Sequence, residues 1–256
     1  ADQSGTDPTV AFAVMEVANA AEICAQVGAS LLAIKRVVYG TALLTAAVAA
    51  EGTALVAGMV PATWAHSWQG PEAPQAWLGA LMRKRTALGR WAAAAAGGRL
   101  LDSPVCLSDL FHPNTFLNAV RQQTARASGC AMDMLRLTST WEVGRRPKGA
   151  ALSVAVEGLQ LQGAAFLGGA LQEPSPGDPE LVNVPALTLA YVPTDAGRTA
   201  GAKGSRGPHA DSDDGAVKVP LYTSTDRETL LAEVSMPAPD GEDKWILAGV
   251  ALFLKE

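Results

Sequence analysis

Cysteine is scarce in this sequence, which has only Cys24, Cys106 and Cys130 among its 256 residues. An odd number at wide spacing argues against a secreted domain held together by disulfides and favours a reducing compartment. Isolated thiols of this kind most often serve as small buried apolar side chains. We therefore predict three structural cysteines, with neither a redox nor a metal role.

Motifs for nucleotide binding and for hydrolysis are also missing. The sequence has no G-x-x-x-x-G-K-[ST] phosphate loop and no G-x-S-x-G nucleophile elbow. Residues Gly197–Ser205 are rich in glycine, but Lys203 precedes Gly204 and does not stand at the spacing that a phosphate loop requires. We predict no cofactor-binding residue in this protein.

The three histidines lie far apart in the sequence, at His66, His112 and His209. None belongs to an H-E-x-x-H motif or lies near a pair of cysteines, so a zinc site has no support. His112, directly before a proline, fits the entrance of a helix better than the role of a general base. Asp133 fits the cap of a turn better than a titrating group in a cleft. We predict no catalytic residue and no metal ligand.

Charge is sparse as well, since charged residues make up 18% of the sequence and the net charge is −5. This balance argues against nucleic acid as a partner. The longest stretch without charge, Gly52–Pro71, contains Pro61, His66 and Gln69, and we therefore predict no membrane span. The apolar share of 48% is enough to build a sizeable core.

Apolar residues at helical spacing predict helices in the first part of the sequence. The predicted ranges are about 15–38, 45–57, 74–97 and 113–129. Thr45 fits an N-cap, Pro113 fits a first helical residue, and glycines end the first, third and fourth ranges. The prolines and glycine of Val60–Pro71 predict a packed connector between the second and third helices.

From Ala151 onward the apolar pattern changes to a period of two, which predicts strands. The six predicted strands cover about 152–156, 159–166, 186–192, 217–222, 230–236 and 245–254. Short strands with connections rich in glycine and proline are typical of a small antiparallel barrel or sandwich. The fold class that we predict is α+β, with a helical part followed by a small six-stranded antiparallel β-barrel.

Charge and secondary structure change at the same place. Residues 1–150 hold thirteen basic and ten acidic side chains, a balance of +3, whereas residues 151–256 hold seven and fifteen, a balance of −8. We therefore predict two domains, a helical one over residues 1–146 and a β-barrel over residues 147–256. Within the second, residues 195–215 are rich in Gly, Ser, Ala and Asp and predict a mobile loop, because they bury little apolar area.

Two groups of side chains permit more than one interpretation. The third predicted helix carries Arg83, Lys84, Arg85 and Arg90, which fit a solvated face better than a phosphate or acidic-protein contact. An acidic partner within the same protein would also satisfy them. The six tryptophans could line a ligand groove, but packing between helices is their commoner role.

Several runs of residues, in their order along the sequence, resemble the C-terminal region of dynein heavy chains. They are Val60–Trp64 (VPATW) with Trp68, Pro71 and the helix Trp77–Trp91, then Leu107–Arg126 (LSDLFHPNTFLNAVRQQTAR), Val156–Ala164 (VEGLQLQGA) and Val219–Arg227 (VPLYTSTDR). In the second run, His112 interrupts the phenylalanine-proline-x-x-phenylalanine-leucine hallmark of the family, as in the cytoplasmic dynein 2, or intraflagellar-transport, class. The ending Gly249–Lys255 is similar to that class too. The resemblance spans about Ala20–Glu256, and the main departure is the long charged loop at 195–215.

The resemblance implies a non-catalytic domain of a minus-end-directed microtubule motor. In that family the domain pairs a helical part with a small barrel, follows the sixth AAA+ module, braces several modules of the ring, and modulates processivity and force. ATP and Mg²⁺ bind elsewhere in the ring. The class implied by His112 carries out retrograde intraflagellar transport in a cilium or flagellum.

The resemblance also implies partners and a location. The partners are the AAA+ modules of the same heavy chain and, through the parent complex, microtubules, the dynein intermediate, light-intermediate and light chains, and intraflagellar-transport trains. The location is the cytoplasm, the cytoskeleton and the axoneme. A second function stays open, that of an adaptor or cargo-binding module whose loop at 195–215 folds on binding.

Overall fold

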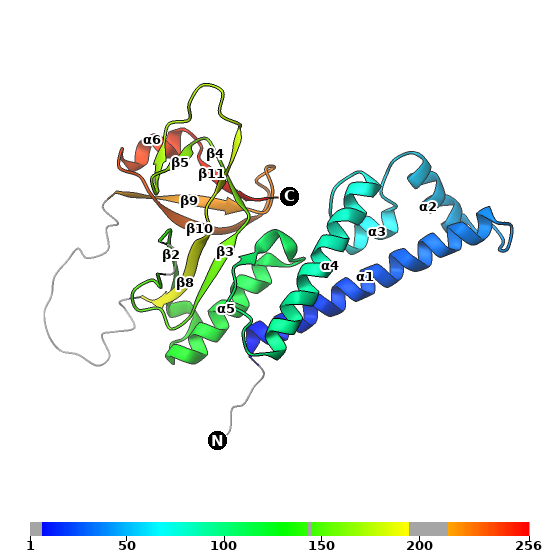
Figure 1. The fold of residues 1–256 in the computed structure, drawn as a ribbon, viewed down its shortest axis with the longest axis horizontal. Coiled ribbons are helices and arrows are strands. Elements are labelled where there is room, and N and C mark those ends of the chain that lie inside the picture. Colours follow the sequence, from blue (N-terminus) through cyan, green and yellow to red (C-terminus); the bar gives the residue numbers. More distant parts are fainter. Residues whose placement is uncertain (1–6, 143–144, 195–214, 256) are drawn as a thin grey trace, which may run out of the picture. The chain divides into compact units, whose positions relative to one another are not determined.

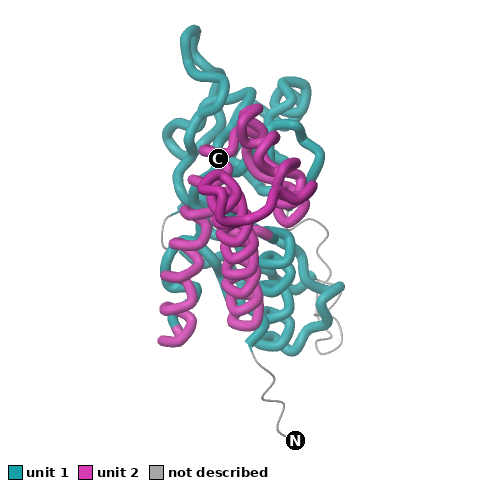
Figure 2. Tube along the Cα trace, turned by 90° about the vertical axis from the view of Figure 1, so that its right-hand side faces the viewer, with its two compact units in different colours: residues 1–9, 99–108, 112–256 teal, residues 10–98, 109–111 magenta. Residues whose placement is uncertain are grey.

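The computed structural model describes residues 7–142, 145–194 and 215–255. The protein forms two compact units, coloured separately in Figure 2. Unit 1 comprises residues 1–9, 99–108 and 112–256, and unit 2 comprises residues 10–98 and 109–111. Each unit is a set of residues that pack together in space, and neither is one continuous stretch of the sequence. The division at residues 146 and 147, which rests on the change in sequence pattern, stays a prediction.

Unit 2 consists of helices, and three of them lie where the sequence predicts helices, although α1 begins earlier than the predicted residue 15 (Figure 1). They are α1 (Pro8–Val38), whose first two residues count with unit 1, α2 (Ala46–Val56), α3 (Ala62–Ser67) and α4 (Pro74–Ala96). The Thr45 hydroxyl accepts a hydrogen bond from the Val48 N–H at 3.4 Å, which confirms the predicted N-cap of α2. Within the predicted connector, α3 is a helix that the sequence pattern did not reveal.

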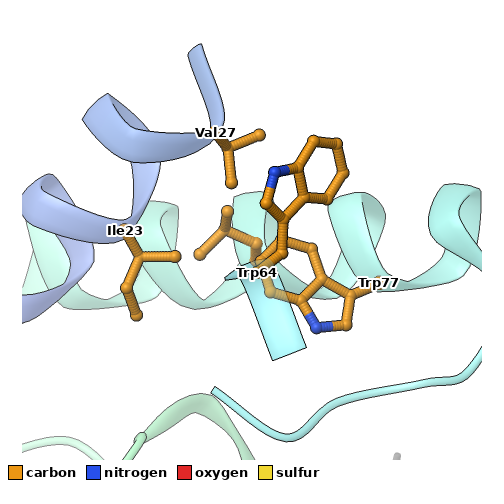
Figure 3. Packing of buried hydrophobic residues seen from close by; sticks show 5 residues of the cluster. Ile23, Val27, Trp64 and Trp77 are labelled. Atoms are coloured by element: carbon orange, nitrogen blue, oxygen red, sulfur yellow. The ribbon is translucent and has the colours of Figure 1, made fainter. Parts of the chain in front are cut away.

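The core of unit 2 joins three of these helices around two indole rings (Figure 3). Ile23 and Val27 of α1 pack with Trp64 of α3 and with Trp77 and Leu81 of α4. The ring centroids of Trp64 and Trp77 lie 5.6 Å apart. Helices α1, α3 and α4 therefore share a core in which two indole rings pack with aliphatic side chains.

Unit 1 contains the strands, α5 (Pro113–Ser128) and α6 (Glu242–Leu247). Two short 3-10 turns, η1 (Leu107–Asp109) and η2 (Met132–Met134), precede α5 and the second strand; Asp109 itself belongs to unit 2. The start of α5 at Pro113 and its end before Gly129 confirm the predicted bounds. Gly129 has a φ of 67°, a left-handed conformation that glycine adopts at no steric cost.

The strands form two larger sheets and a hairpin. The first sheet has the order β1-β3-β8-β2, the second β10-β9-β11-β4-β7, and β5 pairs with β6. Their bounds are β1 (Val105–Cys106), β2 (Leu135–Thr140), β3 (Ser153–Glu157), β4 (Leu159–Gln162), β5 (Ala165–Leu167), β6 (Ala170–Gln172), β7 (Leu181–Val184), β8 (Leu187–Pro193), β9 (Ala216–Tyr222), β10 (Leu230–Pro237) and β11 (Ala251–Leu254).

The prediction of a mixed helix and strand protein is confirmed, but that of a six-stranded antiparallel barrel is wrong. Strand β1 runs parallel to β3, and β11 runs parallel to β9, so both larger sheets are mixed. Among the described strands, the backbone ladders leave each sheet with two edges and close no barrel. A period of two marks which side chains share a face, but it does not fix which strands pair or in which direction.

The predicted strand over residues 245–254 needs a second correction. Its first part belongs to α6, and only Ala251–Leu254 form a strand. Gly241, at a φ of 89°, precedes the helix, and Glu242 and Asp243 occupy its first turn. Acidic residues at that end stabilise a helix through its dipole, which explains why the apolar residues that follow did not form one long strand.

Further strands lie outside the predicted set, namely β1, β2, β6 and β7. Strand β2 precedes residue 147 and pairs along its whole length with β8, from Leu135 opposite Pro193 to Thr140 opposite Thr188. The predicted mobile loop at 195–215 lies, apart from Gly215, outside the described residues.

Candidate interaction surface

The residues singled out in the sequence do not gather into a reaction site. Cys24 lies half-buried beside the core of unit 2, whereas Cys106 and Cys130 belong to unit 1. The Cys106 sulfur lies 3.1 Å from the Ser108 hydroxyl, and the Cys130 thiol donates to the Ser128 carbonyl at 3.8 Å. All three thiols are free.

The histidines are separated as well. His66 is exposed on α3, and His112 stands at the N-cap position of α5, although its imidazole makes no capping hydrogen bond. Asp133 is exposed in η2. His209 and the glycine-rich run 197–205 with Lys203 lie outside the described residues. Within the described ranges, no three His, Cys, Asp or Glu side chains are placed to hold a metal ion.

Most of the tryptophans lie at packing contacts. The Trp68 ring packs in a tilted geometry against Trp77, with centroids 5.2 Å apart, and edge-on against Phe111, with centroids 5.6 Å apart. The ring centroids of Trp91 and Phe12 lie 6.0 Å apart. Trp64 and Trp77 are almost wholly buried. These contacts within unit 2 fit the interpretation of the tryptophans as packing residues between helices.

The basic residues of α4 divide into two kinds. Arg83, Arg85 and Arg90 are exposed, whereas Lys84 is buried. The Lys84 ammonium donates to the Leu110 carbonyl at 2.8 Å and lies 5.1 Å from the Trp68 ring centroid and 5.4 Å from that of Phe111. The prediction of a solvated face is therefore wrong for Lys84, because its ammonium group is buried in unit 2 and is hydrogen-bonded there.

The segment Asp109–Phe111 is anchored in unit 2 from two sides. Lys84 holds the Leu110 carbonyl, and the buried Glu16 carboxylate accepts a hydrogen bond from the Phe111 N–H at 2.6 Å. Burial raises the pKa of the Asp109 carboxyl, and the nearby charges of Lys84, Arg90 and Arg83 offset part of that rise. An acidic partner for the basic helix therefore exists within the same protein, as the sequence allowed.

Unit 2 exposes an unusual number of large apolar side chains. On α1 and in the turn that follows it these are Val14, Met15, Leu31, Leu32, Val38, Tyr39, Leu43 and Leu44, and at the end of α2 they are Val56 and Met59. None of the residues of α2 is buried. Single exposed apolar residues are ordinary, but such a series along two consecutive helices is typical of a surface that binds another protein.

Helix α1 is also long and apolar enough to cross a membrane, judged by length and composition. Its inward side nevertheless carries Glu16, which is fully buried and hydrogen-bonded, and packs Ile23 and Val27 against indole rings. These contacts are those of a helix packed on one side within a protein unit, although only 22% of its most apolar stretch is buried.

Comparison with known proteins defines the family. Residues 1–254 match the family of the C-terminal domain of dynein heavy chains, and the protein belongs to that family.

Individual relatives point to one class of dynein. The sequence is 37% identical over 99% of its length to cytoplasmic dynein 2 heavy chain 1 of Mus musculus, and 38% identical over 98% to the protein of that name from Chlamydomonas reinhardtii. It is also 28% identical, over 71% of its length, to the dynein alpha chain of the flagellar outer arm of Chlamydomonas reinhardtii. The sequence spans 6% of the length of either dynein 2 relative.

Proposed function

We propose that this protein is the non-catalytic domain that braces the AAA+ motor ring of a dynein heavy chain and modulates its processivity and force. The observation that carries the proposal is the apolar surface of α1 and α2, in a sequence that spans 6% of the length of its relatives. A surface of this kind needs a protein partner, and the nearest candidate is the rest of the same heavy chain.

The motor that we propose is a minus-end-directed microtubule motor for retrograde intraflagellar transport. Similarity to cytoplasmic dynein 2 heavy chains over nearly the whole sequence supports this assignment. ATP and Mg²⁺ would bind elsewhere in the ring, and the dynein chains, transport trains and microtubules would be partners of the parent complex. The protein would then act in the cytoplasm, along the cytoskeleton and in the cilium or flagellum, where a flagellar relative also belongs by its name.

The test is an optical-trap comparison of the parent motor with and without residues 1–256. We expect a changed run length or stall force while ATP hydrolysis is largely retained. Unchanged mechanics would overturn the brace and favour the adaptor module considered from the sequence. Loss of all ATPase activity would instead mean that the ring needs this domain to stay intact.

A cut at Arg146 is a poorer test of the same idea, although the two sequence patterns meet there. It would leave β2 in the first piece without β8, its partner at six residue pairs. A changed motor could then reflect a broken sheet in unit 1, so removal of the whole domain is the cleaner comparison.

A further inference from the structure

The connection between β6 and β7 carries a serine followed by a proline on a wholly exposed segment. All nine residues of Gln172–Glu180 are exposed, and they form the yellow-green loop that extends beyond the strands of unit 1 in Figure 1. Ser175 and Pro176 lie near the middle of this segment. An enzyme that modifies a folded protein needs such access, because its cleft has to enclose residues on both sides of the reacting side chain.

A β-turn presents the serine. The Asp178 N–H donates to the Ser175 carbonyl at 3.0 Å, and the Ser175 N–H donates to the Asp178 carboxylate at 2.7 Å. Pro176 and Gly177 stand between them, with Gly177 at a φ of +100°, the order that a type II turn favours. Both bonds use the Ser175 backbone, which leaves its hydroxyl outside them. Since Pro176 also favours an extended Ser175, the backbone has the form that a kinase cleft binds.

The residue after the serine selects one class of kinase. Pro176 has no backbone N–H, so an enzyme that binds this segment must accept that position without a hydrogen bond from it. Proline-directed serine/threonine kinases meet this requirement. The charged residues of the segment are all acidic, namely Glu173, Asp178 and Glu180, and they offer nothing to a kinase that recognises arginine or lysine.

The other serine-proline pair of the sequence, Ser103–Pro104, is placed differently. Both residues are exposed, but β1 follows at once and its first residue, Val105, is buried and paired with Val156 of β3. A kinase could not enclose the residues after Ser103 without pulling β1 out of its sheet. This pair therefore serves as an internal control with the same two residues in a closed setting.

Thr86 follows Arg83, Lys84 and Arg85, an order that kinases specific for basic substrates recognise, but the structure argues against its use. Thr86 lies inside α4, and its hydroxyl donates to the Met82 carbonyl at 2.8 Å. Lys84 is buried and bound to the Leu110 carbonyl. Neither the hydroxyl nor the basic residues before it are available in extended form.

We propose that Ser175 is a phosphorylation site for a proline-directed serine/threonine kinase. In the transfer, the Ser175 oxygen attacks the γ-phosphorus of ATP, its proton passes to a carboxylate of the kinase, and ADP leaves as its bond to that phosphorus breaks. The site lies in unit 1, and its modification does not depend on the bracing of a motor ring.

The phosphate would open the turn that presents it. A phosphoserine carries about two negative charges at neutral pH, and here it would stand in one turn with the Asp178 carboxylate. The cation that ties this segment to α6, Lys244, is already shared between Glu173 and Asp240, at 2.9 Å from each. Repulsion should therefore break the bond from the Ser175 N–H to Asp178.

Phosphopeptide mass spectrometry on the full heavy chain tests the site. With a purified mitogen-activated protein kinase, a proline-directed enzyme, and with ATP and Mg²⁺, we expect phosphate at Ser175 and little at Ser103. Pro176→Ala should abolish the modification although the hydroxyl remains. Pro179→Ala, in the same exposed segment, is the matched control and should retain it. Modification of Ser103 in preference to Ser175, undiminished modification of Pro176→Ala, or none at all would overturn the proposal.

Two further measurements extend the test. The same Ser175 phosphopeptide is expected in heavy chain isolated with phosphatase inhibitors from the cells that make it, and its absence there would overturn the proposal. In millisecond hydrogen exchange, the Ser175 amide should exchange faster in the phosphorylated heavy chain, and phosphatase treatment should restore the slower rate. Equal rates would overturn the opening of the turn, whereas the site itself is decided by the phosphopeptides.

Discussion

Ser139 and Ser235 exchange two hydrogen bonds between the two larger sheets. The Ser139 hydroxyl on β2 accepts from the Ser235 N–H on β10 at 3.0 Å and donates to the Ser235 carbonyl at 3.2 Å. The Trp141 indole donates to the same carbonyl at 2.8 Å. Edge strands of different sheets are thus joined through side chains at the place where a barrel would continue its backbone ladder.

Loss of the Ser139 hydroxyl should therefore weaken unit 1. We expect Ser139→Ala to lower the free energy of unfolding by about 1–3 kcal/mol, because the Ser235 N–H loses its acceptor. Ser235→Ala is the control, since Ser235 takes part through its backbone alone, and it should change stability far less. Urea unfolding followed by tryptophan fluorescence measures both, and equal losses would contradict the prediction.

Lys84 provides a second prediction, about the anchoring of Asp109–Phe111. Lys84→Met removes the hydrogen bond to the Leu110 carbonyl and two contacts with aromatic rings. We expect a loss of about 2–4 kcal/mol in urea unfolding, because the change also leaves buried polar groups without their cation. Arg85→Met, at the exposed neighbouring position, should change stability by less than about 0.5 kcal/mol. If Lys84→Met left the free energy of unfolding unchanged, packing alone would hold Asp109–Phe111 in place.

The carboxyl of Asp109 makes stability depend on pH. Its pKa is raised above the ordinary value of 3.8, chiefly by burial, so the folded state binds the proton more tightly than the unfolded state does. The free energy of unfolding should then fall as the pH rises from below 3.8 through the raised pKa, and level off above it.

Asp109→Asn should remove this dependence. We expect the variant to unfold at higher urea concentration than the unaltered protein at neutral pH, and the two midpoints to converge in acid. Asp102→Asn, at an exposed residue of unit 1, is the control and should shift the midpoint little at either pH. A variant that is less stable at neutral pH would mean that attraction to the basic residues of α4 outweighs burial.

Gly158 links the turn between β3 and β4 to the sulfur of Cys106. Its φ is +73°, and a Cβ atom there would lie 2.6 Å from the Cys106 sulfur. Gly158→Ala should cost about 2–4 kcal/mol, from the left-handed conformation and the clash together. Gly168→Ala is matched in φ, at +62°, but meets nothing within 4 Å, and should cost about 1 kcal/mol. Adding Cys106→Ala to Gly158→Ala removes the clash, so the cost of the double variant in thermal unfolding should fall to about that of Gly168→Ala.

Glu51 should control the rigidity of α2. In Glu51→Ala the Ser30 and Thr63 hydroxyls lose their shared acceptor, and we expect the amides of α2 to exchange hydrogen faster. No residue of the helix is fully buried, and Leu55 is its one side chain that packs against the core of unit 2, so the polar contacts should matter for its opening. Glu72→Ala, at an exposed position before α4, should leave that exchange unchanged. If the amides of α2 exchanged hydrogen equally slowly in the unaltered protein and in both variants, the hydrogen bonds to Glu51 would be dispensable for the rigidity of α2.

Helices α1, α2 and α4 of unit 2 could be predicted because their ends carry local signals, whereas the short α3 could not. Thr45, the proline at the start of α4 and the glycines after α1 and α4 act within a few residues of the helix ends. The strand pairing could not be predicted in the same way. That β1 joins β3, and that β2 joins β8, depends on contacts between segments far apart in sequence.

The burial of Glu16 and Lys84 could not be predicted from the apolar pattern, although both stand at core positions of their helices. Lys84 follows Trp77 and Leu81 and precedes Leu88 on the buried side of α4, and Glu16 stands four residues after Phe12 on α1. Both lie at the spacing of core residues, but charged side chains are ordinarily assigned to solvent. Conversely, Met15 and Leu31 fit an apolar stripe of α1 and are exposed, because the apolar surface extends around that helix.

The division of the protein into units sets an order for folding during synthesis. Unit 2 is complete once Phe111 has left the ribosome, since residues 109–111 are the last that it contains. Unit 1 has to wait for residues 251–254, because β11 pairs with both β4 and β9. Residues 7–9 are made before unit 2 but count with unit 1, where the Gln123 amide donates to Asp7 at 2.8 Å. The nascent protein therefore displays the exposed apolar side chains of α1 and α2 before its second unit exists, and this is the interval in which it would need protection from aggregation.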